Sequence, residues 1–112
     1  MFLHQPPVPA VDAADVPEDG YVLDVREPAE WLAGHAPGAH HIPLGELPQR
    51  AAEVPQGRQV HVMCKVGGRS ARAAQFLNEN GWDTVNVDGG MMAWAAAGRP
   101  MSSEDGRPPE VL

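Results

Sequence analysis

The sequence predicts an α/β fold, with a central, mainly parallel sheet of about five short strands and helices on both faces. Short runs rich in valine alternate with segments of helical spacing, which is the pattern of strand–helix–strand units. Glycine and proline contribute 12 residues each to a chain of 112, so the elements must be short and separated by many turns. In sheets of this kind ligands bind beyond the carboxyl ends of the strands.

The predicted strands are short β-rich runs bounded by turn residues. Three are clear and two are weaker candidates, at residues 21–25, 60–63 and 84–87, and at residues 8–11 and 39–42. Asp24 and Arg26 stand at the end of one clear strand, and Cys64 directly follows another. Because the carboxyl ends of parallel strands share one edge of the sheet, we expect these three residues at the same edge.

Helical features appear between the strands. They cover residues 28–33, 44–53, 70–80 and 90–97. Pro28 suits a first helical position, and Trp31 and Leu32 are expected to point inward behind it. Ser70 is a suitable N-cap for the longest of these helices, and Gly81 is a suitable stop.

A chain of this length is predicted to form one domain. Residues 8–100 would make up that domain and residues 1–7 a loose lead-in. Residues 101–112 are rich in Ser, Glu, Asp, Gly and Pro, so we expect a flexible, solvated tail there.

The formal net charge of −7 argues against nucleic acid as a partner. No apolar run is long enough to cross a membrane, and the N-terminal residues lack the basic start of a secretory signal. Cys64 is the single cysteine, which forbids an internal disulfide and a multi-cysteine zinc site. These features favour a cytoplasmic location. Although the chain is acidic, residues 58–100 carry five basic and three acidic residues, so Cys64 lies in a locally basic stretch.

One segment carries a motif for chemistry, and we call it the Cys64 loop. It consists of Cys64, Lys65, Val66, Gly67, Gly68, Arg69 and Ser70. Two adjacent glycines let the backbone turn tightly and direct several N–H groups toward one point, and the helix that follows adds the positive end of its dipole. Two basic side chains add further positive charge. Such a loop suits a small anion and activates a thiol, so Cys64 is predicted to be a nucleophile. The alternative is an ordinary buried cysteine, a frequent role for this residue type.

Four segments resemble the single-domain rhodanese-like sulfurtransferases, and together the resemblance spans about residues 8–100. In the family's order and spacing, they are residues 23–27 with Trp31, residues 34–43, the Cys64 loop, and residues 88–94 followed by 98–100. His41 stands where the family usually has Asn, and Ala36 where it usually has Ile. Both departures lie in a connection, so they bear on turn geometry rather than on chemistry.

The resemblance implies an enzyme without a metal or organic cofactor. Cys64 would take a sulfane sulfur from a small anionic donor such as thiosulfate and become a persulfide. It would then pass the sulfur to cyanide, to an external thiol or to a protein acceptor. Backbone N–H groups from Lys65 to Ser70 would hold the persulfide and the donor's oxygens, whereas Asp24 and Arg26 would chiefly brace this edge of the sheet.

Three other interpretations compete with this one. A cysteine-based phosphatase or arsenate reductase also places a cysteine before an anion loop, but those loops need five residues between Cys and Arg, and here four intervene between Cys64 and Arg69. A non-catalytic interaction module could use the same fold. A metal site at His35, His40 and His41 is disfavoured, because no cysteine or carboxylate stands at ligand spacing beside them.

Overall fold

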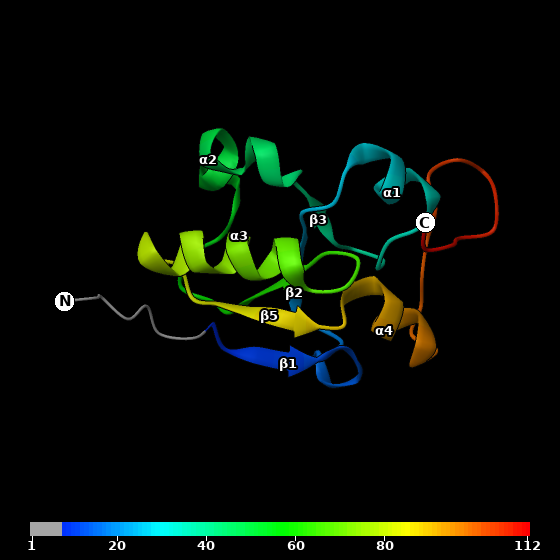
Figure 1. The fold of residues 1–112 in the computed structure, drawn as a ribbon, viewed down its shortest axis with the longest axis horizontal. Coiled ribbons are helices and arrows are strands. Elements are labelled where there is room, and N and C mark those ends of the chain that lie inside the picture. The colour runs from blue at the N-terminus through cyan, green and yellow to red at the C-terminus, as the bar shows by residue number, and fades with distance from the viewer. Residues whose placement is uncertain (1–7) are drawn as a thin grey trace.

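Five parallel strands form the centre of the structure, a computed structural model that describes residues 8–112 (Figure 1). The predicted lead-in at residues 1–7 lies outside the described residues. The strands are β1 (Ala10–Asp12), β2 (Tyr21–Asp24), β3 (His40–His41), β4 (Val60–Met63) and β5 (Thr84–Asp88). They lie side by side in the order β1-β5-β4-β2-β3, so β4 occupies the middle of the sheet. The predicted fold class is confirmed, and the predicted strand boundaries differ from the observed ones by at most two residues.

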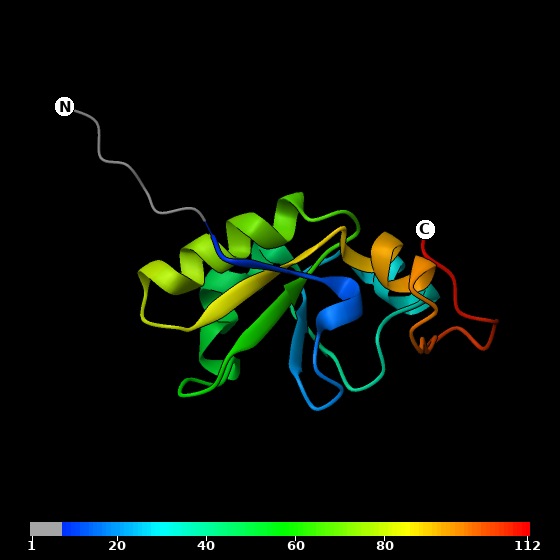
Figure 2. The ribbon, with the colours of Figure 1, turned by 90° about the horizontal axis from the view of Figure 1, so that it is seen from below.

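Helices cover both faces of this sheet (Figures 1 and 2). They are α1 (Pro28–Ala33), α2 (Leu47–Arg50), α3 (Gly68–Glu79) and α4 (Gly90–Ala96), with 3₁₀ turns at Ala13–Asp15, Leu44–Glu46 and Ala51–Glu53. On one face, Leu47 of α2 and Leu77 of α3 pack on a buried cluster that includes Cys64. On the other, Met91 and Trp94 of α4 pack on a second cluster. Among the described residues, no helix is long and apolar enough to cross a bilayer.

The segment predicted as one helix at residues 44–53 is divided in three. A 3₁₀ turn leads into the single turn of α2, and a second 3₁₀ turn follows it. Pro48 explains where α2 begins, because proline lacks an N–H and is tolerated in the first turn of a helix.

Two local predictions need correction. The longest helix, α3, starts at Gly68, and its N-cap is Gly67 rather than Ser70. Pro28 does occupy the first position of α1, but Leu32 does not point inward, since it is 47% exposed. Trp31, half-buried, has the rings of His35 and His41 stacked on it, with centroids 3.6 and 4.7 Å away.

Residues 101–112, predicted as a flexible, solvated tail, lie along the end of α1, and most of them are exposed (Figures 1 and 2). His35 and Ser102 exchange two backbone hydrogen bonds of 2.8 Å, and the N–H groups of Glu104 and Glu110 donate to carbonyls in the last turn of α1. Carbonyls at a helix end have no partner within the helix. The C-terminal segment supplies some of the missing donors, which is the physical reason for its position.

Candidate active site

Cys64 lies directly after β4, at the carboxyl end of the central strand. The Cys64 loop turns the chain from β4 into α3, while β5 flanks it on one side and β2 on the other. On the β2 side, the N–H of Val25 donates to the carbonyl of Met63 at 2.9 Å, so β2 and β4 stay paired up to this edge. The loop therefore begins from a rigid position.

Two glycines allow the loop to take its shape. Gly67 has φ of +115°, a conformation that other residues rarely adopt. Gly90, at the start of α4, lies so close to the loop that a Cβ atom there would overlap the carbonyls of Cys64 and Lys65. This close approach lets the N–H groups of Met91 and Met92 donate to those two carbonyls, at 2.8 and 3.1 Å. The start of α4 thus fixes the first residues of the loop.

The thiol of Cys64 is 1% exposed and surrounded by hydrogen-bond donors. Its Sγ accepts from the N–H of Gly67 at 3.0 Å and faces the hydroxyl of Ser70 at 3.2 Å. Burial alone would raise the pKa of this thiol. The Ser70 hydroxyl and the N–H groups of Ser70, Gly67 and Val66 outweigh that effect, and the pKa lies below its ordinary value of 9.0. The arrangement favours a thiolate at the bottom of an amide-lined loop.

Asn86, in the middle of β5, also reaches the loop, and the sequence prediction missed it. Its Nδ2 donates to the carbonyl of Gly67 at 3.1 Å, and its Oδ1 accepts from the hydroxyl of Ser70 at 2.5 Å. The side chain is buried. One signal was available in the sequence: a polar amide side chain stands between Val85 and Val87 in a predicted buried strand.

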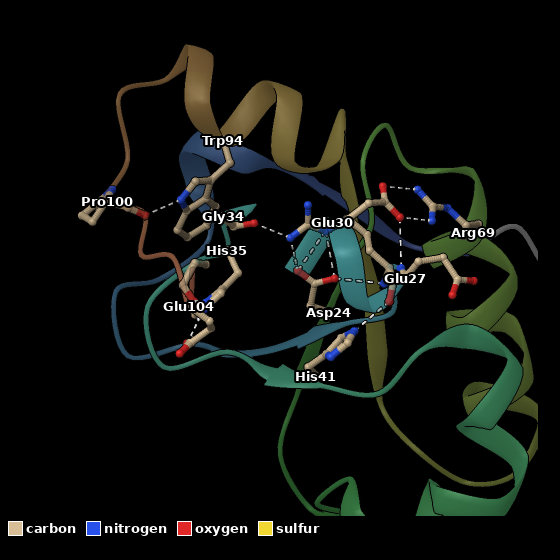
Figure 3. Close-up of polar contacts among 12 residues, drawn as sticks. Asp24, Glu27, Glu30, Gly34, His35, His41, Arg69, Trp94, Pro100 and Glu104 are labelled. Atoms are coloured by element: carbon tan, nitrogen blue, oxygen red, sulfur yellow. Dashed lines mark hydrogen bonds and ion pairs between the residues drawn. The ribbon is translucent and has the colours of Figure 1, made fainter. Parts of the chain in front are cut away.

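The two basic residues of the loop have different environments. Arg69 forms a bidentate ion pair with Glu30 of α1, with N–O distances of 2.7 and 3.0 Å (Figure 3). Hydrogen bonds from the Arg69 guanidinium lower the pKa of Glu30 to about 2, so the pair is charged at neutral pH. Lys65 is half-buried and makes no ion pair within residues 8–112. Val66, 64% exposed, forms the outer surface of the loop.

Asp24 and Arg26 lie at the same edge of the sheet as Cys64 but bond elsewhere. They form a fully buried, bidentate pair with N–O distances from 2.8 to 3.1 Å. The Arg26 guanidinium also donates to the carbonyl of Gly34 at 2.7 Å, and the His41 ring contacts the carbonyl of Arg26 at 2.7 Å (Figure 3). Arg26 Nη1 is buried with no hydrogen-bond partner in residues 8–112. The pair ties β2 to the end of α1.

A groove of about 540 Å³ runs beside the loop. The groove is lined by Leu44, Gly45, Leu47 and Pro48, by Arg69, Arg72 and Phe76 of α3, and by Glu27. Arg72 is exposed, so its charge faces the groove and the solvent. The groove combines apolar surface with charged groups of both signs, two arginines and Glu27.

The histidines singled out by the sequence do not gather into a metal site. His35 faces Glu104 and His41 faces the backbone carbonyl of Arg26 (Figure 3). His40 faces Tyr21 and Glu53. Within residues 8–112 no group of three or more potential ligands is placed to hold a metal ion.

Fold and loop together define an α/β protein with one cysteine at the carboxyl edge of a parallel sheet. Residues 10–97 match the family described as Rhodanese-like domain, and the chain belongs to that family. It is 39% identical to YtwF of Bacillus subtilis over 83 residues, which are 74% of this chain and 81% of the relative. It is 38% identical to a sulfurtransferase of Allochromatium vinosum over 90 residues, or 80% of this chain and 84% of the relative.

A solved structure of a related protein has the same fold as this chain. The rhodanese-related protein from Thermoplasma volcanium has a TM-score of 0.79 and 35% identity, with 84% of this chain and 97% of that chain covered. Sulfur transfer is the general activity that the family and its named relatives support.

Proposed function

We propose that this protein is a sulfurtransferase that carries a sulfane sulfur as a persulfide on Cys64. The Cys64 thiolate attacks the outer sulfur of thiosulfate or a similar anionic donor. A new S–S bond forms on Cys64, the S–S bond of thiosulfate breaks, and sulfite leaves with its electron pair. An external thiolate or cyanide then attacks the outer sulfur of the persulfide, takes it as a new persulfide or as thiocyanate, and restores the Cys64 thiolate.

The hydrogen bonding of the thiol is the observation that carries this proposal. A buried sulfur that accepts from the Gly67 N–H and faces the Ser70 hydroxyl is stabilised as an anion. The same donors can hold the negative charge of a persulfide. An ordinary core cysteine would have apolar neighbours instead and a raised pKa, whereas here the pKa of Cys64 is lowered.

The position of Arg69 argues against a cysteine-based phosphatase. In such an enzyme the arginine that closes the loop binds the oxyanion directly. Here both terminal nitrogens of the Arg69 guanidinium, Nη1 and Nη2, are engaged by Glu30, and the loop is one residue shorter than those enzymes need. A donor anion would therefore rely on backbone N–H groups and on Lys65.

The groove beside the loop is the proposed approach for the acceptor. Its apolar wall, with Leu44 and Leu47 opposite Phe76, suits the carbon skeleton of a thiol, and Arg72 at its border suits a carboxylate. Because Cys64 is the single cysteine, no second thiol of this chain can resolve the persulfide. The acceptor must come from outside.

Intact-mass spectrometry tests the proposal directly. The protein is incubated with thiosulfate and no acceptor, desalted and weighed, while the released sulfite is quantified. We expect one added sulfur atom and about one sulfite per chain. Adding cyanide should return the original mass and produce an equal amount of thiocyanate.

Cys64→Ser is the matched control, because the hydroxyl is similar in size and cannot form a persulfide. This variant should fold normally, gain no sulfur and lose sulfur transfer completely. A non-catalytic module would leave the unmodified protein at its original mass under all donors tried. Full activity in a folded Cys64→Ser protein would remove Cys64 from the mechanism.

A further inference from the structure

Asn86 lies behind the Cys64 loop and is largely shielded from solvent. It points from β5 toward α3 and is buried, with 7% of its surface exposed. Both ends of its amide are used, since Nδ2 contacts the Gly67 carbonyl and Oδ1 contacts the Ser70 hydroxyl. These are two of the residues whose donors face Cys64 Sγ. Asn86 therefore does not contact the thiol itself, and it can affect the thiol only through Gly67 and Ser70.

The Gly67 carbonyl fixes which way the amide faces. A carbonyl only accepts, so it requires the Nδ2 donor of Asn86 in front of it. The amide oxygen is then necessarily turned to Ser70, and the hydroxyl must be the donor in that contact. At 2.5 Å this is a shorter contact than the 3.2 Å between Ser70 Oγ and Cys64 Sγ.

The Ser70 hydroxyl has one proton and two acceptors. When Cys64 is protonated, its S–H is a donor, and it can face Ser70 Oγ while the hydroxyl proton points to Asn86. When Cys64 is a thiolate, the sulfur accepts, and the hydroxyl proton is attracted to it instead. The amide oxygen thus competes with the thiolate for a single proton.

We propose that Asn86 is a positioning residue, which accepts the hydrogen bond of the Ser70 hydroxyl while Cys64 is a thiol and competes with Cys64 Sγ for that hydrogen bond once the thiolate has formed. The proposal rests on the proposed function, in which that thiolate is the nucleophile. It assigns Asn86 a restraining role: the amide keeps the thiolate from being stabilised further than the loop amides already do. Without an acceptor at position 86, the Ser70 hydroxyl would donate its hydrogen bond to Cys64 Sγ alone.

The test measures the pKa of Cys64 from the rate of its alkylation by iodoacetamide across a pH series, which requires no sulfur transfer. Asn86→Val removes the competing acceptor. We expect the pKa to fall by about half a unit to one unit, because the Ser70 hydroxyl then has one acceptor left. The rate at a pH below the pKa should rise about three- to tenfold.

Thr84→Val provides the matched control. Thr84 lies on the same strand and points to the same helix, where its hydroxyl contacts the carbonyl of Ala74 and the side chain of Asn78. Its replacement removes a buried hydrogen bond between β5 and α3 without touching the Cys64 loop. A general loosening of this interface would shift both variants alike, whereas the proposal predicts no change of the Cys64 pKa in Thr84→Val.

The same measurement in a Ser70→Ala background separates the two routes by which Asn86 could act. If Asn86 acts through the hydroxyl, Asn86→Val shifts the pKa in the presence of Ser70 and leaves it unchanged in its absence. An equal shift in both backgrounds, or a rise in the pKa of the single variant, would overturn the proposal. The charged groups at this edge stay the same in every variant: Asp24, Arg26, Glu27, Glu30, Lys65, Arg69 and Asp88.

Asn86→Asp gives a second, isosteric route if the valine variant does not fold. A carboxylate attracts the Ser70 hydroxyl more strongly than an amide does, and it adds negative charge near Cys64. We expect the pKa to rise, opposite to the change in Asn86→Val, and to rise more in the presence of Ser70 than in the Ser70→Ala background. Equal rises in the two backgrounds would be an effect of the added charge alone and would overturn the proposal. Loss of thiosulfate chemistry with an intact pKa pattern would instead refute the proposed function alone.

Discussion

Glu30 controls how much of the loop's positive charge is available. Its carboxylate binds both terminal nitrogens of the Arg69 guanidinium, and its side chain is 16% exposed. A bidentate pair of this kind is stronger than a pair on the open surface, because less water competes for the charges. It also connects α1 to the start of α3, across the mouth of the Cys64 loop.

Glu30→Gln should therefore lower stability in a way that depends on pH. The pKa of Glu30 is about 2 in the folded protein and near 4.5 ordinarily, so the unfolded chain binds a proton more readily. The stabilisation is fully present above about pH 5 and is lost as the pH falls toward 2. We expect Glu30→Gln to reduce the free energy of unfolding by about 1–2 kcal/mol at pH 7, and by much less near pH 2.5. Urea unfolding over this pH range measures both values.

Glu46→Gln is the control for that experiment. Glu46 pairs with Arg50 on the surface, with 55% of its side chain exposed. Its replacement should change stability by less than about 0.5 kcal/mol at any pH. Equal losses in the two variants would mean that the Glu30–Arg69 pair adds no more than a surface contact.

At this scale the sequence predicted the loop but not its supports. The residue types and spacing of the Cys64 loop indicate an anion-binding thiol site without any knowledge of distant segments. Glu30 and Asn86 reach the loop from α1 and β5, through contacts between residues 39 and 19 positions apart. No local pattern encodes such pairings, since they depend on how the elements pack.

The junction between β2 and α1 is the element that braces this edge of the sheet. Asp24 ends β2, and its partner Arg26 is fully buried and also bonds the carbonyl that follows α1. A buried pair is stable only while both charges are present, because either one alone would be left in a medium of low polarity. We therefore expect the pair to have a structural role and to take no part in the chemistry of Cys64.

Asp24→Ala should destabilise the domain strongly. It leaves the Arg26 guanidinium buried without a counter-charge, which typically costs about 3–5 kcal/mol. Chemical denaturation gives the loss, and iodoacetamide alkylation over a pH series reports on the thiol in the same protein. We expect the loss of stability without a large change in the Cys64 pKa. Normal unfolding together with a strongly raised pKa would assign Asp24 a direct part in the site.

Helix boundaries show where local signals fail. Serine is a frequent N-cap residue, yet the Ser70 hydroxyl bonds Cys64 and Asn86, and Gly67 is the N-cap instead. Which residue caps the helix thus depends on Asn86 of β5, a strand that comes after the helix in the sequence. Residues 44–53 have helical spacing, but Pro48 prevents the regular helix from beginning as early as residue 44. Strands were easier to predict, because buried parallel strands are short valine-rich runs with clear ends.

The C-terminal segment, residues 101–112, contacts residues 32–35 at the end of α1. Residues 101–112 pair with His35 and satisfy carbonyls at the end of α1, and Met101 and Val111 pack against the cluster beneath α4. His35 faces the carboxylate of Glu104 at 2.8 Å and the carbonyl of Ala36 at 2.9 Å (Figure 3). Composition alone did not reveal this, because a polar segment can be held by backbone hydrogen bonds as well as by apolar burial.

Removal of residues 101–112 should destabilise the fold without disabling the thiol. Four backbone hydrogen bonds to residues 32–35 would be lost, each contributing about 0.5–1.5 kcal/mol. The entropy regained by the released segment offsets part of this, so we expect a net loss of about 2 kcal/mol. The truncation ends after Pro100, whose carbonyl accepts from the Trp94 indole. Urea unfolding measures the loss, and the rate of Cys64 alkylation by iodoacetamide should stay unchanged.

Arg107→Ala is a suitable control within the segment, since the hydrogen bonds of Arg107 are made by its backbone, to Ser103 and Asp105 of the same segment. It should leave stability unaltered. If the truncated protein were as stable as the full chain, the segment would be solvated in solution, as its composition suggests.

The order of the strands has a consequence for the behaviour of the protein at high concentration. The two edges of the sheet are β1 and β3, which have three and two residues. An exposed edge is a template on which a strand of another molecule can add, and long flat edges lead to aggregation. Here Pro9 precedes one edge strand and Pro43 follows the other closely, so neither edge can be extended by continuous pairing. The longer, valine-rich strands β2, β4 and β5 would pair with another molecule most readily, and they are enclosed in the middle of the sheet.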